Sequence, residues 1–151
     1  MKIFQVPQKK LTARVRMKGD RDLDGVFYYA AAGPGGGEGR LTDRLNDADE
    51  RFLPLAQEGR GCLLNKEWIL IVTCDAGLAP PEEAAEHHIA VQIHLADGTD
   101  LEGRLHFTMP PGRERLLDFI NAAPRFIPVY GDGVAHLVNR DAITSIEGNE
   151  S

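Results

Sequence analysis

Two stretches of the chain decide the fold, because each repeats the other: residues 51–72, RFLPLAQEGRGCLLNKEWILIV, and residues 125–146, RFIPVYGDGVAHLVNRDAITSI. They align without a gap at an offset of 74, and most of the differing positions keep their apolar or polar character. Self-similarity at a fixed offset indicates a chain built from repeated units. The sequence therefore predicts an internal duplication.

The match extends outward from these stretches to earlier parts of the chain. Residues 40–48 match residues 115–123, and residues 11–29 match residues 89–107, with small changes of offset that fall in turns or loops. We therefore expect three parts, which are repeat 1 over residues 1–74, a linker over residues 75–86 and repeat 2 over residues 87–151.

Each repeat has the same predicted order of elements, β-β-α-β-β-β. Alternating apolar and polar residues predict the strands, and Asp97-Gly98 is a strong hairpin signal. Leucine or isoleucine residues four apart, such as Leu41 and Leu45, predict one short helix per repeat. Pro54 and Pro128 fall at equivalent places in predicted strands, so those strands are expected to be sheet edges or to begin at the proline. The expected fold class is α+β and mostly β, with two tandem pseudo-symmetric small barrels of Sm-like or SH3-like type, each with one short helix.

Composition places the chain among globular proteins, with 42% hydrophobic and 26% charged residues. No apolar run approaches the roughly 20 residues that span a bilayer, and the first residues lack the apolar stretch of a secretory signal. We expect a cytoplasmic protein without membrane contact. Cys62 and Cys74 match no metal-binding spacing and are expected to be reduced thiols.

Charge is divided unevenly between the two halves, although the total is −6. Residues 1–75 hold 12 basic and 11 acidic residues, whereas residues 76–151 hold 5 and 12. On a strand, Arg14, Arg16 and Lys18 share one face. This face is interpreted either as a small anion-binding strip or as a solvated surface.

The most notable polar residues form two equivalent pairs, Asn65-Lys66 and Asn139-Arg140, between apolar strands. One hypothesis is a pair of equivalent donor surfaces for a phosphate or carboxylate. The alternative is turn chemistry, in which the asparagine caps the turn and the basic residue is solvated.

Other motifs indicate no catalytic group, metal site or cofactor. The glycine-rich loop over residues 33–39 lacks the Gly-Lys-Ser/Thr of a phosphate loop and is interpreted as a linker. His88 and His106 would meet if their strands pair, but two histidines fall short of the three or four ligands of a zinc site.

Parts of repeat 2 resemble the Sm-like (LSm) domains. Residues 91–103, VQIHLADGTDLEG, resemble the opening hairpin of that family, and residues 136–146, HLVNRDAITSI, resemble its closing strands. The resemblance implies a small bent-sheet barrel, but the base-binding motif of the family is not found between these segments. The full pattern of both repeats also resembles an uncharacterised bacterial domain family, which supplies no activity.

The sequence thus predicts a non-catalytic binding or interaction module. It would act through an exposed edge strand or through the Asn65-Lys66 and Asn139-Arg140 turns, on a protein partner or by self-association. One alternative is an Sm-like RNA-binding protein, which the net charge of −6 disfavours. The other is a regulator that binds a small ligand such as a nucleotide or anion.

Overall fold

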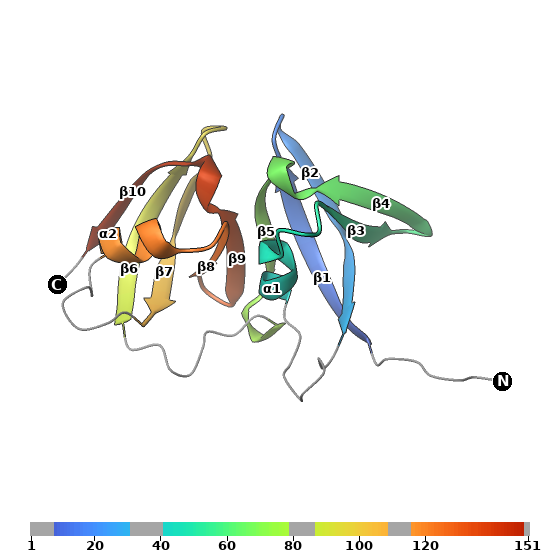
Figure 1. Cartoon of the computed structure of the whole chain (residues 1–151), viewed down its shortest axis with the longest axis horizontal. Helices are drawn as coiled ribbons and strands as arrows, with labels where there is room; N and C mark the ends of the chain where they lie inside the picture. Colours follow the sequence, from blue (N-terminus) through green and yellow to red (C-terminus); the bar gives the residue numbers. More distant parts are fainter. Residues whose placement is uncertain (1–7, 31–40, 79–86, 109–115, 150–151) are drawn as a thin grey trace.

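The computed structural model describes residues 8–30, 41–78, 87–108 and 116–149 (Figure 1). Ten strands and two short α-helices make up most of this part of the chain. In chain order, the first half contains β1 (Gln8–Met17), β2 (Arg21–Ala30), α1 (Leu41–Asn46), β3 (Phe52–Gln57), β4 (Arg60–Asn65), the 3₁₀ turn η1 (Lys66–Trp68), β5 (Ile69–Asp75) and the 3₁₀ turn η2 (Ala76–Leu78). The second half contains β6 (His87–Leu95), β7 (Asp100–Phe107), α2 (Leu116–Ala122), β8 (Phe126–Tyr130), β9 (Val134–Asn139), the 3₁₀ turn η3 (Arg140–Ala142) and β10 (Ile143–Asn149).

The strands form one antiparallel sheet in the order β10-β6-β7-β8-β9-β5-β1-β2-β3-β4. The predicted fold class of two tandem α+β barrels, each with its own helix, is therefore wrong, although the expectation of a mostly β chain is confirmed. The two halves are joined where β5 pairs with β9, from Ile71 opposite Val138 to Asp75 opposite Val134. In Figure 1 these two strands lie side by side at the middle of the molecule.

The join has a physical cause in the sequence of β5. Its residues Ile69, Leu70, Ile71 and Val72 are all buried, in a run without the alternation of a half-exposed strand. A strand of this kind needs apolar neighbours on both faces, which a single small barrel with one core cannot supply. Pairing with β9 brings a second core against β5.

The two cores lie on opposite faces of the sheet. Val72 and Cys74 of β5 face the first core, and Phe126, Ala135 and Leu137 of the second half complete that core. The second core lies mainly in the second half, but Leu70 and Ile71 contribute to it. Each core therefore contains residues from both halves.

Both proline-containing strands differ from the prediction, since neither is a sheet edge and neither begins at its proline. β3 lies between β2 and β4, and β8 lies between β7 and β9. Pro54 pairs with Leu63 and Pro128 with Leu137. On its other side, β3 pairs with β2 through a single residue pair, at Ala56. In the same way, β8 pairs with β7 through a single residue pair, at Tyr130. The prolines therefore lie outside that short ladder, where a missing backbone donor does no harm.

Two equivalent glycines allow this close packing of strands. A Cβ atom on Gly25 would come within 2.6 Å of Leu55 Cγ, and one on Gly103 within 2.6 Å of Val129 Cγ1. Any larger residue would force β3 away from β2 or β8 away from β7.

Both helices are short, and across the described residues no helix has the length and apolar character needed to cross a membrane.

Candidate interaction surfaces

The Asn65-Lys66 turn is part of the internal structure of the first half. The side-chain oxygen of Asn65 accepts a hydrogen bond from the backbone N–H of Glu67 at 3.1 Å, as the turn interpretation predicts. The expectation that Lys66 is solvated is wrong, since it is 3% exposed. Its ammonium group donates to the carbonyl oxygens of Arg44 and Asp47 and lies 3.6 Å from a carboxylate oxygen of Glu50. Lys66 thus binds the carbonyl end of α1.

The Asn139-Arg140 turn repeats this arrangement and adds a contact between the halves. The oxygen of Asn139 accepts from the N–H of Asp141 at 3.0 Å, while its Nδ2 donates to the carbonyl of Ile69 at 2.9 Å. Arg140 donates to the carbonyl of Ala123, just beyond the end of α2. Lys66, Asn139 and Arg140 therefore each donate hydrogen bonds to backbone carbonyls within the protein.

The basic strip of β1 is also paired. Arg14 lies 3.0 Å from Asp24 in an exposed ion pair. Arg16 contacts Asp97 at 2.9 Å, which links the two halves, and it also contacts Asp20 and Asp22. The ammonium of Lys18 lies 5.4 Å from the centre of the Trp68 ring. Since the two arginines face aspartates, little net positive charge remains on this strip.

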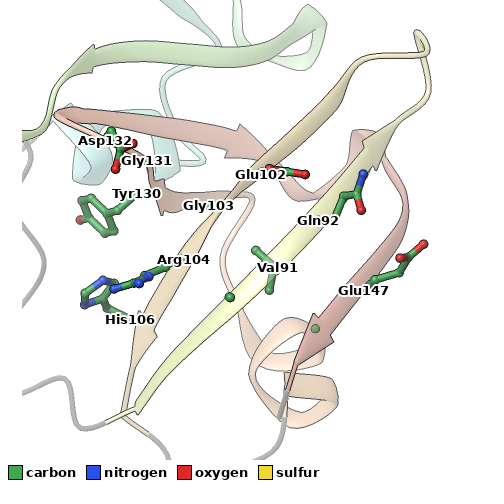
Figure 2. Close-up of a pocket in the computed structure, with 12 residues that line it drawn as sticks. Val91, Gln92, Glu102, Gly103, Arg104, His106, Tyr130, Gly131, Asp132 and Glu147 are labelled. Atoms are coloured by element: carbon green, nitrogen blue, oxygen red, sulfur yellow. The ribbon is translucent and has the colours of Figure 1, made fainter. Parts of the chain in front are cut away.

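The second half carries an open hollow on the face of the sheet opposite its own core. Its volume is about 880 Å³, and Figure 2 shows Arg104, His106 and Tyr130 at one side of it and Gln92, Glu102 and Glu147 at the other. The His88 and His106 rings are 4.4 Å apart, as the predicted strand pairing requires. No group of three or more metal-ligating side chains occurs among the described residues.

The histidines of this half differ in their ionisation. Burial lowers the pKa of His106, and the nearby His88 and Arg104 lower it further. The hydrogen bond from His94 to Asp100, at 2.6 Å, raises the pKa of His94, and Glu147 adds to the effect. The lowered pKa favours the neutral form of His106, so Arg104 is the principal positive charge at that end of the hollow.

The surface that sequence reasoning left unspecified is the outer face of the β3–β4 hairpin. β4 ends the sheet. Phe52 is 48% exposed and Leu63 is 69% exposed. Pro54 is also exposed and joins them, because it lies two residues after Phe52 on β3 and directly opposite Leu63 on β4. We call Phe52, Pro54 and Leu63 the edge patch. The period-2 alternation of β3 predicts that Phe52 and Pro54 share one face of the strand. It does not predict that this face is exposed to solvent.

The matched residues of the second half are buried. Phe126 corresponds to Phe52 and Leu137 to Leu63, and both are 0% exposed against the first core. The side chain of Asn46 in α1 holds the Phe126 backbone by accepting from its N–H at 2.7 Å and donating to its carbonyl at 3.1 Å. The same sequence pattern thus lies in an interface in one half and in solvent in the other.

The glycine-rich loop over residues 33–39 and the later part of the predicted linker, residues 79–86, lie outside the described residues. Comparisons of the chain with protein-family models, with curated proteins and with solved structures find no match. The resemblances to Sm-like domains and to a bacterial domain family remain predictions.

Proposed function

We propose that this protein is a non-catalytic interaction module that binds another polypeptide at the β3–β4 edge. The observation that carries the proposal is the edge patch at β4, whose outer backbone groups have no neighbouring strand among the described residues. An end strand with exposed apolar side chains is a template for strand addition, in which backbone hydrogen bonds supply affinity and side chains supply specificity.

The Asn65-Lys66 turn supports this surface from within the first half. Lys66 lies directly after β4 and fixes the end of that strand to α1. The β4 edge is therefore presented by a rigid support, which lowers the entropy lost on binding.

A capture experiment with matched variants tests the proposal. The tagged full chain is cross-linked and isolated, and bound polypeptides, including further copies of the chain, are quantified. Leu63→Asp places a charge on the edge patch and is expected to remove at least about 90% of the captured polypeptide, because a buried uncompensated charge is strongly unfavourable. Tyr28→Asp is the control, since Tyr28 is 38% exposed but lies on β2 and outside the edge patch. Equal capture by wild type and Leu63→Asp would contradict the proposal.

A second candidate function is binding of a small anionic ligand in the hollow. It is favoured by Arg104, which is exposed and forms no ion pair with any described residue, and by the His106 and Tyr130 rings 5.0 Å apart beside it. A ring system with a negative group would suit this end of the hollow. A thermal-shift series with nucleotides should then raise the Tm of wild type but not of Arg104→Gln.

A further inference from the structure

We propose that the edge patch of one molecule binds the second core and the β10 edge of a second copy, so that the chain associates head to tail. This inference rests on the interaction module proposed above and names its partner. It follows from the contact between the two halves, in which the counterparts of Phe52 and Leu63 pack against the first core. β9 and β5 are neighbours in the sheet, while their sequence counterparts β4 and β10 are its two open ends.

The acceptor side of the proposed contact is open at the corresponding place. In the first core, Phe126 and Leu137 cover Leu45 and Val72, which are 2% and 0% exposed. The matched residues Ile120 and Ile146 of the second core are only half-buried. Ile143 is also half-buried, whereas its counterpart Ile69 is 0% exposed. Among the described residues, the second core is thus less covered at this place than the first core, and Phe52 and Leu63 of a second copy would supply the apolar cover.

Two asparagines provide matching polar contacts. Asn46 and Asn139 bond across the internal join, to the backbone of Phe126 and of Ile69. Their counterparts are Asn121, which is exposed, and Asn65. Within the described chain, neither Asn121 nor the Nδ2 of Asn65 makes a hydrogen bond. A copy placed by the internal geometry would bring Asn121 to the Phe52 backbone and Asn65 to the Ile143 backbone.

Charge favours contact between unlike ends. The first half, which carries the edge patch, has one more basic than acidic residue, whereas the second half has seven more acidic residues. In the register copied from β5–β9, Glu147 of β10 lies opposite Cys62 of β4 and diagonal to Arg60, within reach of a long side chain. Contact between two β10 edges would instead bring two acidic halves together.

β10 carries Thr144 and Ser145 where β5 has Leu70 and Ile71. The proposed β4–β10 contact between two copies is thus more polar on its β10 side than the β5–β9 contact within one molecule. We expect a reversible association at micromolar concentrations rather than a permanent one. A head-to-tail contact uses different surfaces on the two copies, so it builds closed rings or open chains larger than a dimer.

The first experiment measures mass in solution. Sedimentation velocity of the full chain over the micromolar range should show species of several monomer masses that dissociate on dilution. Leu63→Asp should weaken the association by more than about tenfold, as expected for an apolar residue at the centre of an interface. Tyr28→Asp should associate like wild type. A monomer at every concentration overturns the inference, as does association that Leu63→Asp leaves unchanged.

The second experiment tests the register, because a disulfide accumulates even when the contact between copies is short-lived. Glu147→Cys places a thiol opposite Cys62 of the neighbouring copy, in a cross-strand pair close enough for a disulfide. Mild oxidation should produce covalent oligomers of this variant. Arg104→Cys adds an exposed thiol on β7, away from both open edges, and should remain largely monomeric. Equal cross-linking of the two variants overturns the proposed register.

The two proposals fail in distinguishable ways. If the chain is monomeric but Leu63→Asp loses a captured heterologous protein, the interaction module stands and the second copy is the wrong partner. If Leu63→Asp changes neither capture nor mass, both proposals fail.

Discussion

Phe126→Ala tests whether the chain is one cooperative unit, because Phe126 belongs to the second half but is 0% exposed in the first core. Removing a fully buried phenylalanine side chain lowers the free energy of unfolding by about 3–5 kcal/mol. With a urea m-value of about 2 kcal/mol/M, the midpoint should fall by about 1.5–2.5 M. The matched variant Phe52→Ala removes the same group from a 48% exposed position and should lower the free energy of unfolding by less than about 1 kcal/mol.

The assay uses two probes at the lowest practical concentration, so that association does not contribute. Trp68, the only tryptophan, lies in the first half, and its fluorescence reports unfolding of that half. Far-UV circular dichroism reports the strands of both halves. Because each core contains residues of both halves, the two probes should give one midpoint, and Phe126→Ala should shift both by the same amount.

Two results would refute this reasoning. One is a Trp68 transition that Phe126→Ala leaves in place while the circular dichroism transition moves, because it would show that the halves unfold separately. The other is an equal destabilisation by Phe52→Ala and Phe126→Ala, because it would show that the two phenylalanines have the same environment in the isolated molecule.

Three further predictions concern buried and titrating groups. Lys66→Met should lower the free energy of unfolding by about 2–3 kcal/mol, because carbonyls at the end of α1 lose their buried donor; a change below about 0.5 kcal/mol in urea unfolding would contradict this. The pKa of His94 is raised by its hydrogen bond to Asp100, so this pair stabilises the fold fully below about pH 6.5 and its contribution is lost as pH rises through the raised pKa. In wild type the urea midpoint should therefore fall as pH rises from about 6.5, and Asp100→Asn should make this fall smaller. An equal change of the urea midpoint with pH in the two proteins would contradict the role given to the His94–Asp100 pair. Burial raises the pKa of Cys74 to about 11, whereas Cys62 is only partly buried; a thiol reagent should therefore modify Cys62 first and Cys74 only after unfolding, and equal native rates would disprove this.

Much of the local structure could be predicted from sequence because it depends on neighbouring residues. Alternation placed the strands close to their observed positions, and the Asn65 and Asn139 turns could be identified because an asparagine side chain caps a backbone group two residues later. The pairing of His88 with His106 followed from a single hairpin around Asp97-Gly98. Each of these features involves one short segment or one hairpin.

The site could be predicted only in part. An exposed edge strand was expected, but not which one. The burial of Lys66 was missed because its acceptors, the Arg44 and Asp47 carbonyls, lie about 20 residues away at the end of a helix. The prolines at residues 54 and 128 suggested edges, yet the open edge is the neighbouring strand β4, which carries no proline.

The sequence by itself determined the strands, the turns, the short helices and the side of each strand that is apolar, since these depend on backbone preference and on period-2 patterning. Only the tertiary structure decided that β5 pairs with β9 and that two cores lie on opposite faces of one sheet. The pair Phe52 and Phe126 shows the physical reason. Both follow an arginine and begin a matching strand, but whether such a side chain is covered depends on a neighbour that is distant in the chain, and local sequence does not specify that neighbour.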